Sequence, residues 1–266
     1  MAAQVHPSAF VHESARLGDD VVVGPCAVIE EDVVIGAESR IDAFASVKSH
    51  TRMGERNHIH SYACVGGEPQ DLKFHGEVTS LEMGDGNTVR EFATLHRGTE
   101  GGGGVTRIGS NNLLMAYTHV AHDCVLGSGI VMSNGATLAG HVHVGDHVIL
   151  SGLSAVHQFV RIGDHAFVGG MSGIAQDLPP FMLAVGHRAG VHSPNLVGLR
   201  RMQASRELIA ALKNAYRLVW NSEVPRKEAL EQLEYELGNY PEVLLFVEFI
   251  RASERGILPV SQGTPV

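Results

Sequence analysis

The sequence predicts a mainly β protein: a parallel β-solenoid followed by a C-terminal α-helical domain. Three observations predict it. An aliphatic residue or methionine recurs at every sixth position over most of the stretch from Val5 to Ile174. Glycine accounts for 31 of 266 residues, whereas aromatic residues make up only 6%. After Ser205 the apolar residues take the spacing of an α-helix instead. The core must therefore be built from aliphatic side chains at many equivalent positions.

The six-residue repeat begins at Val5 and holds for eleven consecutive positions, up to Val65. It returns briefly between Met83 and Leu95, and it then continues from Ile108 to Ile174. An α-helix would need a period of 3.6 residues and a simple amphipathic strand a period of 2. A period of six instead fits a short strand followed by a turn. Such units form flat-sided coils whose strands pair between successive coils.

Glycine often directly follows the repeating aliphatic residue, as at Gly18, Gly36 and Gly145. We expect these glycines to make the turns at positive φ, which glycine adopts without steric cost. The position four after the aliphatic residue is usually small or β-branched, as at Ala27 and Ala136. Small residues at these tight positions explain why large rings are scarce.

Two segments interrupt the repeat, near residues 66–82 and 98–106. Loops that leave a rigid solenoid tend to carry function. We expect the second segment, with its glycine run 101–104, to be only a flexible loop tip. The first segment is more promising because three polar residues lie close together there: Gln70, Asp71 and Lys73.

The last part of the chain is predicted to be helical. Apolar residues recur at helical spacing after Ser205, and Pro225 and Pro241 are suited to begin two further helices, the last ending at Gly256. We therefore divide the chain into a solenoid domain, residues 1–190, and a helical domain, residues 191–266. The helical domain is expected to cover the exposed edge strands at the open end of the solenoid.

Composition excludes several classes of protein. The net charge is −9, from 20 basic and 29 acidic residues, which argues against a nucleic-acid-binding protein. No run of 18 apolar residues exists, so no stable membrane insertion is expected. The three cysteines show no metal spacing, and the first ten residues lack the features of a signal peptide. A cytoplasmic protein is therefore predicted.

The repeating pattern of aliphatic residue, glycine, two variable residues and a small residue resembles the hexapeptide-repeat family. This resemblance implies a left-handed parallel β-helix with three hexapeptides in each coil of 18 residues. Residues 18 apart then stack in columns along the outer wall. Five polar or glycine residues are thereby placed around one spot on three successive coils: His122, Asp123, Gly140, His141 and Gln158.

Three interpretations compete for these histidines. Outward histidines are often only solvated. They could also hold zinc, as in the γ-type carbonic anhydrases of this fold, but His119 and His122 are three residues apart and match that metal pattern poorly. No bound metal is therefore expected. A neutral imidazole oriented by a carboxylate, beside a backbone N–H that can stabilise an oxyanion, can act as a general base. The cluster around His122 favours this third interpretation.

Longer motifs resemble the UDP-N-acetylglucosamine 3-O-acyltransferase family, and the resemblance covers essentially the whole chain. The motifs are Tyr117-Thr-His-Val-Ala-His-Asp-Cys, Ala139-Gly-His-Val, Ala155-Val-His-Gln-Phe, Gln70-Asp-Leu-Lys, Leu95-His-Arg-Gly-Thr and Gln176-Asp-Leu-Pro-Pro. The repeats begin at residue 5, and we expect no further domain before them. This organisation argues against related hexapeptide-repeat transferases that carry an extra N-terminal domain.

The resemblance implies an acyltransferase of lipid A biosynthesis. Such an enzyme transfers an (R)-3-hydroxyacyl group from acyl carrier protein to the 3-hydroxyl of UDP-N-acetylglucosamine, without a cofactor. By motif position His122 is the general base, Asp123 orients it, and the Gly140 N–H stabilises the oxyanion. An acceptor with a 3-amino group in place of the hydroxyl remains an open alternative.

The resemblance also implies a homotrimer with sites between subunits, and a set of residues that bind substrate. At the end of the acyl groove, Gly170 suggests a longer chain, because a bulky residue there would shorten the groove. Asn195 and Arg201 fit a UDP-binding segment, although Val197 stands where the family often has an acidic residue. The remaining substrate-binding positions are Gln70, Asp71, Lys73, His96, His119, His141, His157 and Gln158.

A group of basic residues near the start of the helical domain could dock acyl carrier protein, which is acidic. An ordinary solvated face is the alternative, and both remain open. The residues are Arg200, Arg201, Arg206, Lys213 and Arg217.

Overall fold

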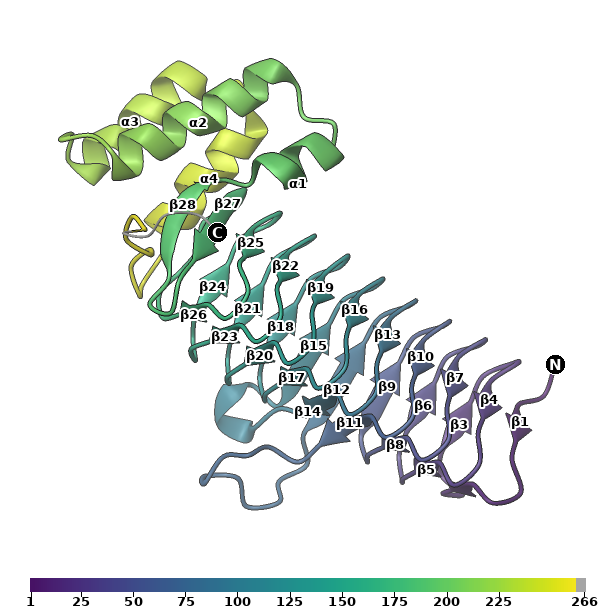
Figure 1. Cartoon of the computed structure of the whole chain (residues 1–266). Helices are drawn as coiled ribbons and strands as arrows, with labels where there is room; N and C mark the ends of the chain where they lie inside the picture. The colour runs from purple at the N-terminus through teal and green to yellow at the C-terminus, as the bar shows by residue number, and fades with distance from the viewer. Residues whose placement is uncertain (262–266) are drawn as a thin grey trace.

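Each six-residue unit forms one short strand and one turn, and three units complete a coil, so three parallel sheets run along the molecule (Figure 1). The computed structural model describes residues 1–261. The N-terminus lies at one end of the solenoid and the helical domain at the other (Figure 1). The predicted repeat is therefore the physical unit of the fold.

The strands fall into three sheets, here called A, B and C. Sheet A contains β1 (Gln4–Val5), β4 (Val22–Val23), β7 (Arg40–Ile41), β10 (His58–Ile59), β13 (Thr88–Val89), β16 (Leu113–Leu114), β19 (Val131–Met132), β22 (Ile149–Leu150), β25 (Phe167–Val168), β27 (Met182–Val185) and β28 (Gly190–Pro194). Sheet B contains β2 (Phe10–Val11), β5 (Val28–Ile29), β8 (Ser46–Val47), β11 (Cys64–Gly67), β14 (Thr94–His96), β17 (His119–Val120), β20 (Thr137–Leu138), β23 (Ala155–Val156) and β26 (Gly173–Ile174). Sheet C contains β3 (Arg16–Leu17), β6 (Val34–Ile35), β9 (Thr51–Met53), β12 (Ser80–Met83), β15 (Val105–Ile108), β18 (Val125–Leu126), β21 (His143–Val144) and β24 (Arg161–Ile162).

The repeating aliphatic residues fill the axis of the solenoid, as predicted. From Val23 to Ile174 each of them is no more than 4% exposed. The first coil is different, because Val5 is 43% exposed and the repeat residues of β2 and β3 are only half-buried. No preceding coil covers their side, so the core begins one coil later than the repeat does.

The predicted role of the repeat glycines is wrong. Gly18 and Gly36 do not have positive φ; the left-handed residues lie two positions later, as at Asp20 and Glu38. Close packing explains the glycines instead, since a Cβ on Gly18 would lie 2.7 Å from the backbone nitrogen of Ala37 on the next coil. The turns therefore place mostly non-glycine side chains in the left-handed conformation at each corner.

Up to residue 261, the helical domain comprises four helices: α1 (Leu196–Arg201), α2 (Arg206–Trp220), α3 (Arg226–Leu237) and α4 (Pro241–Arg251). Ser205 caps α2 by accepting a hydrogen bond from the N–H of Leu208 at 3.1 Å. The predicted end of the last helix at Gly256 is wrong, since α4 ends at Arg251 with Ala252 as its cap. Helix α1 has no counterpart among the predicted helices.

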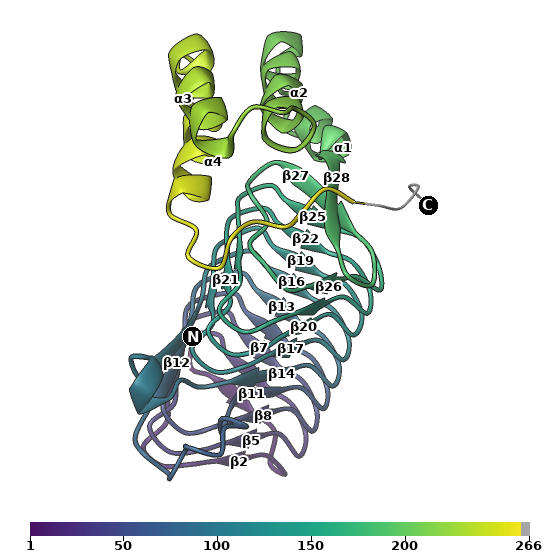
Figure 2. The ribbon, with the colours of Figure 1, turned by 90° about the vertical axis from the view of Figure 1, so that its left-hand side faces the viewer.

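An antiparallel hairpin, β27–β28, joins the two parts of the chain and closes the edge of sheet A. After α4 the chain runs back across the end of the solenoid (Figure 2), where Leu258 donates its N–H to the carbonyl of Asp177. The division at residue 190 stays a prediction, and β28 spans it. Residues 262–266 of the predicted helical domain lie outside the described part. No helix in residues 1–261 is long and apolar enough to cross a membrane.

Candidate active site

Three successive coils bring the predicted histidine cluster together at the corner between sheets B and C. Strands β17, β20 and β23 pair in register, so the turns that follow them stack. The His141 N–H donates to the carbonyl of His122 at 3.0 Å, and the Phe159 N–H donates to that of Gly140 at 3.2 Å. The columns expected from an 18-residue coil are thus present in the structure.

His122 and Asp123 form the centre of this cluster. Asp123 takes the left-handed corner conformation, with φ of 58°, which turns its carboxylate back beside the preceding residue. Nδ1 of His122 lies 2.7 Å from Oδ2 of Asp123. The Asp123 side chain is only 1% exposed, whereas that of His122 is 13% exposed. The carboxylate therefore fixes the ring while the far edge of the imidazole stays accessible.

Thr99 holds the other side of the Asp123 carboxylate. Its N–H donates to Oδ1 at 2.8 Å and its hydroxyl donates to Oδ2 at 2.6 Å. Thr99 also caps a 3-10 turn, η1 (Glu100–Gly102), and Gly102 packs directly against the carboxylate. The prediction that the glycine-rich segment is only a flexible loop tip is therefore wrong, because this segment covers Asp123. Thr99 belongs to the motif Leu95-His-Arg-Gly-Thr, but no sequence pattern indicates its contact with Asp123.

Gly140 is required by the position of the His122 ring. A Cβ on Gly140 would lie 2.6 Å from Cε1 and 2.7 Å from Nε2 of His122. Any other residue would push the imidazole away from the wall. No described residue accepts a hydrogen bond from the Gly140 N–H. This donor is therefore available beside the exposed edge of the ring.

Two further histidines line the same wall. The ring of His96 packs edge-on against that of His119, with centroids 4.8 Å apart. Burial, together with the charges of His119 and His122, lowers the pKa of His96 to about 4. Burial and His122 also lower the pKa of His119, whose Nδ1 lies 2.7 Å from the hydroxyl of Thr94. Both rings are neutral at neutral pH, so they can contribute hydrogen bonds but no charge.

His141 lies one coil beyond His122, with the ring centroids 5.1 Å apart. Burial lowers the pKa of the His141 imidazole below its usual range, and the Asp123 carboxylate opposes this only in part. His122, Asp123 and His141 offer three ligand atoms within 4.8 Å of one another. The carboxylate, however, already faces His122 and the two donors of Thr99, so a metal would have to displace these hydrogen bonds.

The two loop excursions enclose a cleft next to this cluster. The cleft has a volume of about 430 Å³, and its lining includes Asp71, Lys73 and Thr99. Gln70 is exposed on the same loop. Arg97, which the sequence analysis missed, ties the first loop to β14: it contacts Glu68 at 3.3 Å and lies over the ring of Phe74. The first excursion therefore forms one wall of the site.

His157 and Gln158 are exposed on the next coil, and His157 borders a second, mostly apolar groove of about 620 Å³. Gly170 lies elsewhere, on the turn between sheets A and B. Asn195 caps α1 and donates its Nδ2 to the carbonyl of His165, while Arg201 is exposed at the end of that helix. Within one chain, Gly170 thus lies on another corner than His122, and Asn195 and Arg201 belong to the segment after β28.

Known proteins share this organisation. The chain is 44% identical over 254 residues to the acyl-[acyl-carrier-protein]–UDP-N-acetylglucosamine O-acyltransferase of Thermodesulfovibrio yellowstonii, covering 96% of this chain and 98% of the relative. The chain belongs to the UDP-N-acetylglucosamine O-acyltransferase family. A family model described as UDP N-acetylglucosamine O-acyltransferase, domain 2, matches residues 177–258, and a bacterial hexapeptide-transferase model matches residues 106–140.

Solved structures of this acyltransferase family agree. LpxA from Acinetobacter baumannii is 41% identical with a TM-score of 0.93, covering 96% of this chain and 99% of that one. LpxA from Bacteroides fragilis is 38% identical with a TM-score of 0.94, covering 96% and 100%. The predicted fold class is confirmed: a left-handed parallel β-helix with a C-terminal helical domain. The family inferred from the motifs is confirmed as well.

Proposed function

We propose that this acyltransferase moves an (R)-3-hydroxyacyl group from acyl carrier protein to the 3-hydroxyl of UDP-N-acetylglucosamine, the first step of lipid A biosynthesis. Family membership supports the substrates. The geometry of His122 supports the mechanism: its Nδ1 is held by Asp123 at 2.7 Å, and no described residue hydrogen-bonds to its Nε2. With its proton on Nδ1, the imidazole keeps a lone pair on Nε2 and can act as a base.

In the proposed reaction, Nε2 of His122 takes the proton of the sugar hydroxyl as its oxygen attacks the thioester carbonyl carbon. The carbonyl oxygen becomes an oxyanion, and the free Gly140 N–H donates to it. When the tetrahedral intermediate collapses, the carbon–sulfur bond breaks and the imidazolium returns its proton to the thiolate of acyl carrier protein. Every proton is accounted for by one histidine, and no cofactor is required.

Asp123 and Thr99 act together in this scheme. The carboxylate stabilises the imidazolium that forms on His122, and the two donors of Thr99 keep the carboxylate fixed while the charge develops. Thr99 is a positioning residue, since it reaches the reacting atoms only through Asp123. Exclusion of water by the loop strengthens both interactions.

The other residues of the cluster are proposed to hold the sugar nucleotide and the acyl chain. His141 lies beside His122 and within reach of the charge of Asp71, which lines the loop cleft together with Lys73. The remaining proposed contacts come from the first excursion, from β14 and β17, and from the turn after β23: Gln70, His96, His119, His157 and Gln158.

A homotrimer would complete this site. Gly170, Asn195 and Arg201 do not lie on the corner that carries His122, so a neighbouring subunit would have to supply them. The corner between sheets A and B carries an exposed ladder of stacked aromatic rings, suited to burial in such an interface: Phe44, Tyr62, Phe92 and Tyr117. We place the enzyme in the cytoplasm without stable membrane insertion.

Acyl carrier protein is proposed to dock on the basic face of the helical domain, whose residues are all exposed: Arg200, Arg201, Arg206, Lys213 and Arg217. Attraction between exposed charges is screened by salt. The second-order rate of transfer should therefore fall steeply as salt is added, and a rate independent of salt would contradict this docking surface.

An acyl-transfer assay with purified protein tests the proposal. It pairs UDP-N-acetylglucosamine and its 3-amino analogue with (R)-3-hydroxyacyl carrier protein thioesters of increasing chain length. Ester formation on the hydroxyl sugar is expected, and transfer to the amine alone would replace the proposed acceptor.

The same series of thioesters tests whether the residue at position 170 limits the length of the acyl chain. A Cβ on Gly170 would meet only the Gly152 carbonyl oxygen, at 3.4 Å, so a larger side chain can be accommodated. Gly170→Met is expected to shift the preference towards shorter acyl chains. An unchanged chain-length preference would refute this role of Gly170.

A further inference from the structure

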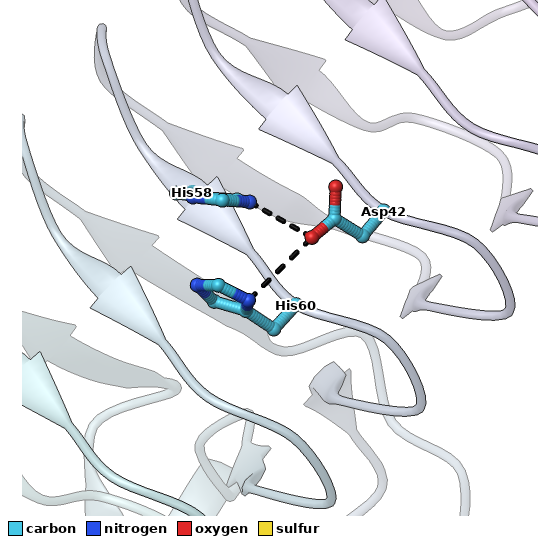
Figure 3. Close-up of side chains that lie close together, drawn as sticks. All are labelled: Asp42, His58 and His60. Atoms are coloured by element: carbon cyan, nitrogen blue, oxygen red, sulfur yellow. Dashed lines mark hydrogen bonds and ion pairs between the residues drawn. The ribbon is translucent and has the colours of Figure 1, made fainter.

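A second group of two histidines and one aspartate lies far along the chain from the proposed active site, at the ends of β7 and β10 of sheet A (Figure 3). These strands pair with Arg40 opposite His58, so Asp42 and His60 leave them side by side. Both imidazoles turn a nitrogen towards the same oxygen, Oδ2 of Asp42: Nε2 of His58 at 2.9 Å and Nδ1 of His60 at 3.5 Å.

The surroundings orient this group. Nε of Arg40 donates to the other oxygen of Asp42, Oδ1, at 2.7 Å, which leaves Oδ2 to the two imidazoles. The two rings stack with their centroids 3.8 Å apart and their planes 25° apart. All three side chains are between 19% and 35% exposed, so an ion from solvent can reach them.

The ligand types suit a divalent cation. Two stacked imidazole rings each offer one nitrogen beside a single carboxylate oxygen. Imidazole nitrogen together with carboxylate oxygen is a common ligand combination for zinc.

The spacing of the ligand atoms fits zinc. Zinc binds imidazole nitrogen at about 2.0–2.1 Å in tetrahedral geometry, which places neighbouring ligand atoms about 3.3 Å apart. The separations of 2.9 and 3.5 Å bracket that value, and all three ligand atoms lie within 4.8 Å of one another. Arg40 supplies the outer hydrogen bond that commonly orients a ligating carboxylate.

We propose that Asp42, His58 and His60 bind one Zn²⁺ per chain, with a water molecule as the fourth ligand. The ion would join two successive coils and stabilise the folded chain. It would lie outside the acyl-transfer machinery, because none of the three residues belongs to the motifs that carry the proposed reaction. The cluster around His122 is the less favourable host, because the Thr99 hydroxyl already donates to the Asp123 oxygen that faces the two histidines, whereas Arg40 donates to the other oxygen of Asp42.

Calorimetric titration of the full-length, chelator-treated protein with ZnCl₂ tests the proposal. One site per chain is expected in the wild type. His58→Gln and Asp42→Asn should each weaken this binding at least about 100-fold, and Arg40→Gln by about 10–100-fold. His50→Gln is the matched control and should bind as wild type, because His50 pairs with Asp32 at 3.0 Å as a single imidazole on its carboxylate.

Two further readouts keep the result interpretable. Co²⁺ should give the visible absorption of a tetrahedral site in the wild type and not in His58→Gln. Zn²⁺ should raise the midpoint of thermal unfolding of the wild type but not of that variant, provided circular dichroism shows both to be folded. Absence of Zn²⁺ binding by the wild type would overturn the proposal. Binding that survives in His58→Gln but is lost in His141→Gln would also overturn it, by placing the ion at the other cluster.

Discussion

Two regions of this solenoid carry the same three side chains, two histidines and one aspartate, in the same kind of stacked column, yet they differ in what covers them. The Asp123 side chain is 1% exposed beneath the glycine-rich loop, whereas that of Asp42 is 19% exposed on an open wall. Asp123 accepts two hydrogen bonds from Thr99 and faces His122. Asp42 is held by Arg40 and leaves one oxygen to be shared by two rings.

The difference shows that the column alone does not make a general base. Stacked coils bring imidazole and carboxylate together in both places. Two imidazoles also face one carboxylate oxygen in both places, because His141 lies 3.7 Å from the Oδ2 of Asp123 that faces His122. Only at Asp123 does a loop add two further donors, both from Thr99, which hold the buried carboxylate beside His122. The two sites should therefore respond very differently to substitution.

The largest expected difference is in turnover. His122→Ala removes the proposed base, and kcat should fall by about 10²–10⁴-fold, the usual contribution of general base catalysis. His60→Gln, which removes one imidazole from the open cluster, should leave steady-state acyl transfer unchanged. Near-normal transfer by a folded His122→Ala protein would contradict the role of His122 as the general base. An equal loss of kcat in His60→Gln would show that the two sites do not differ in function.

The loop itself can be tested with two neighbouring glycines. A Cβ on Gly102 would collide with the Asp123 carboxylate, whereas one on Gly101 would meet no atom within 4 Å. Gly102→Ala should therefore move the loop or the carboxylate by about 1 Å and lower kcat by about 100-fold. Gly101→Ala is the matched control and should keep wild-type kcat. If both variants transfer acyl groups equally well, the loop does not position Asp123.

Thr99 should give a smaller effect. Thr99→Val removes the hydroxyl donor but keeps the backbone N–H on Asp123. A hydrogen bond to a charged group contributes about 1.5 kcal/mol or more, so kcat should fall about tenfold with KM nearly unchanged. Thr99→Ser restores the donor and should recover most of the loss. A rise in KM without a fall in kcat would assign Thr99 to substrate binding instead.

The sequence predicted the parts of this molecule that follow from its period. The repeat identified the buried aliphatic residues, and an 18-residue coil placed His122, Gly140 and His141 together. The same arithmetic relates Asp42 to His60, although no motif drew attention to that pair. A period fixes which residues stack, but it does not reveal which of the stacked groups are functional.

The remaining features depend on breaks in the period or on a second chain. Thr99 reaches Asp123 across 24 positions because an excursion lies between them, and no count of coils predicts that contact. The glycines were misassigned for a related reason: the clash that requires Gly18 is with Ala37 on the next coil, which local turn chemistry does not show. Gly170 and His122 lie on different corners of the solenoid, so only the assembly of several chains could bring them together.

The smallest expected effect is on stability, at the buried ring of His96. The pKa of His96 is about 4 in the folded protein and near 6.5 in the unfolded chain. Between these values only the unfolded chain takes up the proton, so the free energy of unfolding should fall as the pH drops from 6.5 towards 4, and the stabilisation is complete above 6.5. His96→Gln should flatten this dependence in denaturant titrations across that range. His187→Gln, at an exposed position, is the control expected to keep the wild-type slope. If the free energy of unfolding varied with pH equally in the wild type and in His96→Gln, burial of His96 would not be what disfavours its protonation.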